Sequence, residues 1–119
     1  MAFKKLIKQL KTPVGELDSE RLREFATSVR GCTTIAELHA RQEASVVGEI
    51  SSMRIVPRAG SPSLEATVTD GTGAVVAVWT GRRRIAGVVP GRRLVITGRA
   101  AATGSGSRLF LYNPRYDLL

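Results

Sequence analysis

An apolar run in the middle of the chain, "AVVAVWT", ends in residue types that are suited to binding a polyanion. The run closes on Trp79, the only tryptophan, and three consecutive arginines, Arg82 to Arg84, follow it. An indole ring can stack on any nucleic-acid base, and guanidinium groups hold phosphate through paired hydrogen bonds. In a strand, however, Trp79 shares its side with Val75, so alternation leaves open whether it faces a ligand or fills a core.

A second aromatic pair lies near the end of the chain, in the run "SRLFLYNP". Two leucines alternate there with Arg108, Phe110 and Tyr112. A face that carries arginine is not expected in a protein interior, so both aromatic rings are predicted to lie outside. There each ring either contacts a base or is covered by an N-terminal helix. We expect the helix to cover Phe110 and a ligand to contact Tyr112.

Single arginines at strand ends and in loops complete the candidate set. Arg54 and Arg58 are expected at the end of a first strand and in the loop after it, and Arg99 at the mouth of a Gly/Ser-rich loop. Each suits a phosphate contact, although each taken alone is as well explained as a solvated surface residue. Together with Arg82 to Arg84 they predict a basic rim. The predicted nucleic-acid-binding residues are Arg54, Arg58, Trp79, Arg82, Arg83, Arg84, Arg99, Arg108 and Tyr112.

Residues for catalysis or metal binding are not evident in the sequence. The single cysteine, Cys32, and the single histidine, His39, have no third group to orient them as nucleophile and base. A single cysteine excludes an internal disulfide, and one cysteine with one histidine is too few for a zinc site of familiar spacing. Asp70 belongs to a turn, and the glycine-rich segments lack the context of a phosphate-binding loop. We therefore expect no enzymatic activity, no metal and no cofactor.

The charge balance favours a polyanionic partner. Eighteen lysines and arginines stand against ten acidic residues, which gives a net charge of +8 and a pI near 10.8. All four lysines lie in the first eleven residues, and from residue 41 onward every cation is an arginine. Such an excess points to nucleic acid first and to an anionic membrane surface second.

The expected location is the cytoplasm. No apolar run approaches the roughly 18 residues of a membrane span. The start "MAFKKLIKQLK" lacks the continuous hydrophobic segment and the cleavage site of a secretory signal. A length of 119 residues fits one domain with an added arm.

Residues 1–40 show helical periodicity and are predicted to form an N-terminal helical arm. Apolar residues at positions 3, 6, 7 and 10 make a short amphipathic stub. A second helix is expected to begin at an N-cap, Asp18, and to end at a C-cap, Gly31. Thr34 and Glu37 have the spacing of a capping box, which predicts one further helical turn.

The hydrophobic period changes from 3.6 to 2 near residue 41. Strands are predicted at residues 44–56, 63–70, 74–80, 92–100 and 107–114, with a loop over residues 56–63. Gly48 marks a bend or bulge in the first strand, and Asp70 with Gly71 and Gly73 makes a hairpin turn. The connection from the third to the fourth strand holds at most one helical turn.

These elements predict a mainly β (α+β) protein, in which residues 41–119 form a five-stranded OB-fold barrel and residues 1–40 an N-terminal helical arm. The glycine-bent first strand and the non-hairpin connection between the third and fourth strands favour this fold. An SH3-like barrel, which also has five strands, is the alternative.

The order of the motifs resembles a known family. The opening "VVGEISSMRIV", the "DGTG" hairpin, the aromatic that closes the third strand, a P-G turn and the final "YNPRY" are similar to OB-fold nucleic-acid-binding domains, in particular the wedge domain of the RecG branch-migration helicase. A closer likeness is to short stand-alone actinobacterial OB-fold nucleic-acid-binding domain proteins, which share a stretch similar to "VWTGRRRIAGVVPG" and an end similar to "YNPRY". The resemblance covers about residues 44–117. Helicase motor motifs are absent, so it implies no ATPase activity.

The resemblance and the residues together predict a non-catalytic protein that binds single-stranded DNA or RNA with little sequence preference. In OB folds the second and third strands carry the ligand, framed by the loops after the first and fourth strands. The expected mechanism is a basic groove with one or two stacking aromatics. The alternative is a protein-interaction adapter in a repair, replication or translation complex. Attachment to a membrane through the N-terminal stub is a weaker third possibility, because one short amphipathic segment binds membranes marginally.

Overall fold

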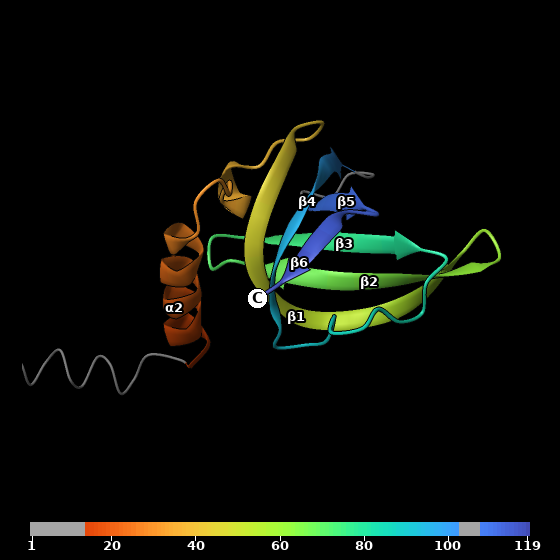
Figure 1. Ribbon diagram of the computed structural model, residues 1–119, viewed down its shortest axis with the longest axis horizontal. Coiled ribbons are helices and arrows are strands. Elements are labelled where there is room, and N and C mark those ends of the chain that lie inside the picture. Colours follow the sequence, from red (N-terminus) through yellow and green to blue (C-terminus); the bar gives the residue numbers. More distant parts are fainter. Residues whose placement is uncertain (1–13, 103–107) are drawn as a thin grey trace, which may run out of the picture.

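The alternating residues of the second part of the chain form strands in a computed structural model, which describes residues 14–102 and 108–119 (Figure 1). Two short elements precede them, the helix α2 (Val14–Ser28) and the 3-10 helix η1 (Ile35–Glu37). The strands are β1 (Glu43–Arg58), β2 (Ser61–Thr69), β3 (Ala74–Thr80), β4 (Arg93–Ala102), β5 (Leu109–Tyr112) and β6 (Arg115–Leu118). The predicted amphipathic stub at residues 3–10 lies outside the described residues.

Five of these strands close into a ring. β1 pairs antiparallel with β2 and with β4, β2 pairs antiparallel with β3, and β5 joins β3 in parallel and β4 antiparallel. β6 adds to β4. A closed ring of five strands with a helix before it is the OB-like architecture predicted from the sequence, and the mainly β fold class is confirmed.

β1 is long and changes partner along its length. Residues 43–49 pair with β4, and residues 49–58 pair with β2. At Gly48, where the change occurs, a Cβ atom would lie 2.5 Å from the backbone oxygen of Thr69. Glycine is therefore required there by the close approach of two backbones, which confirms the predicted bend. The register shift itself lies between Ile50 and Ser52.

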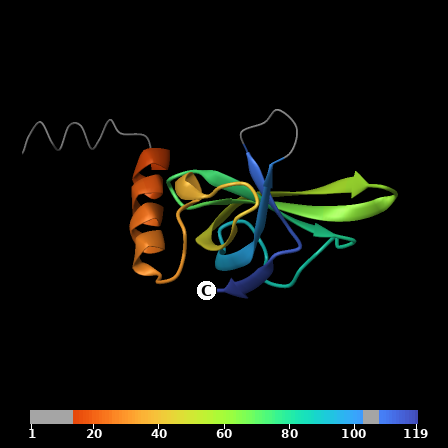
Figure 2. The same cartoon turned by 90° about the horizontal axis from the view of Figure 1, so that it is seen from above.

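The predicted loop at residues 56–63 is wrong, because β1 and β2 form one long hairpin that protrudes from the ring (Figure 2). Only Ala59 and Gly60 lie between the strands, with φ angles of 49° and 80°. Positive φ at both central residues gives a turn whose twist matches that of the strands. The two prolines that suggested a loop, Pro57 and Pro62, are paired across the hairpin end, a position in which proline is tolerated.

The core fills the ring and is closed at both ends. Its fully buried side chains come from every strand of the ring and include Val46, Ile50, Val68, Leu94 and Leu111. Ile35 and Leu38, in and after η1, cover one end. Trp79 is the second-last residue of β3, a strand that begins beside Ile35, so it lies at the opposite end of the core.

The "DGTG" turn holds η1 in place. The Asp70 carboxylate is 1% exposed and accepts the backbone N–H groups of Thr72 and Gly73 inside its own turn. Its Oδ2 atom also accepts the backbone N–H of Ile35 at 2.8 Å, and the Thr72 hydroxyl accepts that of Ala36. The predicted capping box is wrong, since the Thr34 side chain makes no cap hydrogen bond. Asp70 and Thr72 satisfy the start of η1 in its place.

The helix α2 begins at Val14, so Asp18 lies inside it and is not the N-cap that the sequence predicted. Gly15 is tolerated because it falls in the first turn, where fewer helical hydrogen bonds depend on it. α2 ends at Ser28, so Gly31, with φ of 82°, lies in the turn beyond the helix and is not the C-cap that the sequence predicted. α2 buries Leu22 against the ring, and the Arg93 guanidinium lies 4.3 Å from the centre of the Phe25 ring.

The end of the chain differs from the single strand predicted at residues 107–114. β5 stops at Tyr112, and after an interruption at Asn113 and Pro114 the chain continues in the same direction along β4 as β6. Asn113 has a φ of 50°, a left-handed conformation that asparagine adopts more readily than most residues. The boundary between arm and ring at residue 41 stays a prediction, and Ile35 and Leu38 before it are core residues. Within residues 14–102 and 108–119, no helix is long and apolar enough to cross a membrane.

Candidate functional site

Strand pairing aligns two rows of side chains on the outer face of the ring. In the first row Ser52, Thr67, Val76 and Phe110 are successive partners across β1, β2, β3 and β5. In the second row the partners are Arg54, Glu65, Val78 and Tyr112. Because alternate residues of a strand point to the same side, both rows face away from the core.

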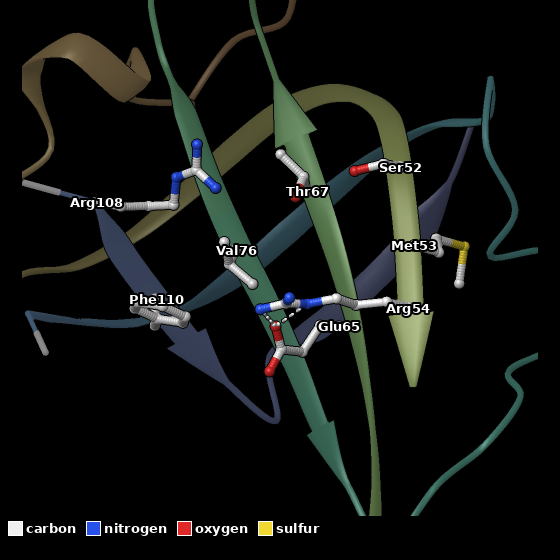
Figure 3. Close-up of a pocket in the computed structure, with 8 residues that line it drawn as sticks. All are labelled: Ser52, Met53, Arg54, Glu65, Thr67, Val76, Arg108 and Phe110. Atoms are coloured by element: carbon white, nitrogen blue, oxygen red, sulfur yellow. Dashed lines mark hydrogen bonds and ion pairs between the residues drawn. The ribbon is translucent and has the colours of Figure 1, made fainter. Parts of the chain in front are cut away.

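The first row and part of the second, together with Met53 and Arg108, line a groove of about 380 Å³, hereafter the outer groove (Figure 3). Phe110 and Arg108 lie on the β5 side of the groove, and Ser52 and Met53 lie on the β1 side. Thr67 and Val76 lie between them. The residues that line it are Ser52, Met53, Arg54, Glu65, Thr67, Val76, Arg108 and Phe110.

Phe110 and Tyr112 stack on each other at the β5 side of this face. Their ring centres are 6.0 Å apart and their planes differ by 15°. Tyr112 is 38% exposed, and Phe110 is partly buried beside Val76. The prediction that both rings lie outside is confirmed. The expectation that the N-terminal helix covers Phe110 is wrong for α2, because α2 contacts β1 and Phe110 lines the groove.

A buried glutamate joins two arginines in the second row. The Glu65 carboxylate is 4% exposed and accepts hydrogen bonds from Arg54 at 3.2 Å and from Arg58 at 2.9 Å. Burial alone would raise the pKa of Glu65, but the hydrogen bonds and charges of the two arginines outweigh it, and the pKa is lowered. Glu65 is therefore ionised at neutral pH and holds both guanidinium groups over the face.

The same arginines remain open to solvent. The Arg54 side chain is 74% exposed and that of Arg58 is 41% exposed. The Arg58 guanidinium also lies 5.9 Å from the centre of the Tyr112 ring, within the range of a cation–π contact. Cationic groups thus adjoin the stacked aromatic pair on this face, with Arg108 at its other side.

Trp79 lies on the inner face of β3. It is 6% exposed, its Nε1–H donates to the backbone oxygen of Pro114 at 3.2 Å, and its ring meets that of Tyr116 edge-on at 5.9 Å. Trp79 is therefore a core residue, and its prediction as a residue that faces the ligand is wrong.

The predicted arginines do not form one continuous rim. Arg54 and Arg108 line the outer groove, and Arg58 lies beside it, next to Glu65 and Tyr112. Arg82 lines a separate cleft at the Trp79 end of the ring, and the exposed Arg83 and Arg84 follow in the same loop. Arg99 lies in a third place, on β4, in a depression beside Arg41.

Several residues of the groove were not predicted as site residues. Ser52, Glu65, Thr67 and Val76 line it, and in the sequence Glu65 and Thr67 alternate with the apolar Leu64, Ala66 and Val68. Their parity was the available signal. The burial of Glu65 could not be predicted from the sequence, because it depends on hydrogen bonds from Arg54 and Arg58 on the neighbouring strand of the hairpin.

Groups suited to catalysis are dispersed in the described residues. Burial raises the pKa of the Cys32 thiol, which lowers its thiolate fraction at neutral pH. His39 is exposed, and Asp70 is occupied by four hydrogen bonds in and near its turn. Over residues 14–102 and 108–119, no three His, Cys, Asp or Glu side chains are grouped so that they could hold a metal ion.

Comparisons with known proteins support the fold. No protein-family model and no curated protein matches the sequence. A solved structure of RecG bound to a three-way DNA junction is similar, with a TM-score of 0.62 and 16% sequence identity. The match covers 72% of this chain and 12% of that chain, so the protein corresponds in size to a small part of its neighbour. At this identity the likeness shows an OB-like fold and nothing further.

Proposed function

We propose that this protein binds single-stranded DNA or RNA in the outer groove, without catalysis, without a cofactor and with little sequence preference. One observation carries the proposal. The face that OB folds use for ligands has a stacked aromatic pair, Phe110 and Tyr112, flanked by Arg54, Arg58 and Arg108. Aromatic rings beside arginines match the two repeating parts of a nucleic-acid strand, its bases and its phosphates.

The aromatic pair supplies the contact with bases. A base that stacks on Tyr112 extends a stack that Phe110 already supports from beneath. Stacking on a side chain contributes about 1–3 kcal/mol per base and works for every base, because each has a π face. The outer groove is therefore suited to strands of mixed sequence.

The arginines supply the contact with phosphates. Arg54 and Arg58 are held by Glu65 at their inner side and are exposed to solvent. Such guanidinium groups lose less side-chain entropy when they bind a phosphate, because the ion pair has already ordered them. Three arginines against one glutamate leave the groove with an excess of positive charge.

The neighbour in the comparison is bound to a DNA junction in its solved structure, which is consistent with a nucleic-acid partner for this chain. The net charge of +8 supports the same class of partner. A protein-interaction adapter, the other function expected from the sequence, requires neither the exposed aromatic ring nor the charge.

The test is a titration of a labelled oligonucleotide of mixed sequence at several salt concentrations. Three phosphate contacts on a single strand predict a slope of log K against log salt of about −2. Arg108→Gln, which disturbs no ion pair of the described residues, should make this slope shallower by about 0.7. Arg30→Gln, which removes an exposed charge after α2, is the matched control and should change it little.

A second variant tests the stacking contact. Tyr112→Ala should weaken binding by about 1–3 kcal/mol and change the melting temperature little, since Tyr112 is 38% exposed. Absence of binding at low salt, or affinity that does not vary with salt, would contradict the proposal and favour the adapter.

A further inference from the structure

A second cleft lies at the end of the ring opposite α2, where β3 finishes. It measures about 540 Å³ and adjoins Trp79, Arg82, Asn113, Arg115 and Tyr116. We call it the end cleft. None of the residues that line the outer groove lines it, so the two are separate features of the surface.

Aromatic side chains form one side of the end cleft. Trp79 is buried beneath it, fixed by its hydrogen bond to Pro114. Tyr116 meets the Trp79 ring edge-on, with 82° between the planes, and remains 39% exposed. Tyr116 is thus a supported ring with free surface, which is the arrangement a base needs for stacking.

The charged groups of the end cleft are all positive. Arg82 and Arg115 line it, and both are exposed. In the described part of the chain, the ion pairs between side chains involve Arg54 and Arg58 with Glu65, so neither arginine of the cleft is paired with an acid there. Guanidinium groups without an acidic partner in a cleft favour an anionic ligand.

The "YNPRY" segment builds this cleft and connects it to the outer groove. The Asn113 backbone N–H donates to the Val78 oxygen at 2.6 Å, and the Asn113 Oδ1 atom accepts the Thr80 backbone N–H at 2.9 Å. These bonds fasten the turn to the end of β3. Tyr112, which stacks on Phe110 beside the groove, and Asn113, which lines the cleft, are consecutive residues, so a strand that leaves the groove past Tyr112 reaches the end cleft next.

We propose that the end cleft is a second subsite for the same single strand, in which Tyr116 stacks on a base and Arg82 and Arg115 bind phosphates. The inference rests on the function proposed above and extends it from one face of the ring to its end. An acidic peptide would satisfy the arginines, but the free surface of Tyr116 next to two cations fits a base and its phosphates better.

Trp79 reports on this subsite, because it is the only tryptophan and lies under the cleft. Addition of an unlabelled oligothymidylate of about 16 nucleotides, the upper limit of OB-fold site sizes, should change its emission until binding saturates. Since Trp79 is on the inner face of β3, a strand confined to the outer groove would leave the emission unchanged.

Two variants test the contacts. Tyr116→Ala should weaken binding of this oligonucleotide roughly 5- to 150-fold, the range expected for the loss of one stacked base. Arg82→Gln with Arg115→Gln should make the salt slope shallower by about 1.4, or 0.7 per lost phosphate contact. This double variant changes exposed residues only, so it remains informative even if Tyr116→Ala lowers stability. A variant with Arg30→Gln and Arg21→Gln, both exposed on or after α2, controls for net charge.

Unchanged Trp79 emission at saturation, together with a wild-type salt slope in the Arg82 and Arg115 double variant, would overturn the inference. In that case the proposed function stands as long as Arg108→Gln still reduces the slope. No binding of any oligonucleotide at low salt would overturn both, so the two failures are distinguishable.

Discussion

Replacement of Trp79 by alanine separates the roles that the sequence left open for this residue. Trp79 is 6% exposed and belongs to the core, where it packs at one end of the ring. The substitution removes most of a large buried side chain and leaves the ring end without its cover. Such changes cost about 3–5 kcal/mol of unfolding free energy, because the lost transfer energy is added to that of a cavity.

The expected loss includes one hydrogen bond. The Trp79 Nε1–H donates to the Pro114 oxygen, and a bond of this kind contributes about 0.5–1.5 kcal/mol. Trp79→Phe also removes that bond but keeps most of the apolar volume of the ring. It should therefore lower the unfolding free energy clearly less than Trp79→Ala. The pair of variants therefore separates packing from hydrogen bonding.

Thermal unfolding followed by circular dichroism measures the effect. For a domain near this size about 1 kcal/mol corresponds to roughly 4 °C, so Trp79→Ala should melt about 12–20 °C below the wild type. Binding of a short oligonucleotide in the outer groove should change little in the folded variant. A melting temperature within about 4 °C of the wild type, combined with weakened binding, would refute the placement of Trp79 in the core.

Three further predictions concern stability. Asp70→Ala should lower the unfolding free energy by at least about 1–3 kcal/mol, because the Ile35 backbone N–H loses its buried acceptor; urea unfolding measures this, and Thr72→Val should be milder. A chain that begins at Gly31 should keep its β-type circular dichroism and melt higher than one that begins at Arg41, which lacks Ile35 and Leu38 in the core; equal melting would contradict the packing of η1. Glu65 has a lowered pKa in the folded state, so its ionisation stabilises the fold above its ordinary pKa of 4.5 and this contribution is lost as pH falls below that value. The wild type should thus exceed Glu65→Gln in stability at pH 7, by a margin that shrinks in acid, and a margin independent of pH would argue against the ion pairs.

The outer face could be predicted from the sequence because alternation is a local property of a strand. Arg108, Phe110 and Tyr112 are two residues apart, and an arginine among them fixes which side is outside. Trp79 could not be placed in the same way. From Ala74 to Trp79 both sides of β3 carry only apolar residues, and the buried positions continue as far as Trp79.

The remaining features of the site depend on residues far apart in the sequence. Asp70 was correctly predicted in a turn, yet its role at Ile35 comes from the packing of η1 against that turn at one end of the ring. The grouping of Arg54, Arg58 and Glu65 requires the long β1–β2 hairpin, which the prolines at its end concealed. The separation of Arg82 from the outer groove follows from the β3–β4 connection, whose path no local pattern specifies.

Backbone amide chemical shifts, measured by NMR while a single-stranded oligonucleotide is added, test the central claim most directly. Binding in the outer groove predicts that the largest changes occur at Thr67, Val76, Phe110 and Tyr112, with smaller ones in α2. Changes confined to α2 and the exposed residues of β4, or no changes at low salt, would contradict the account.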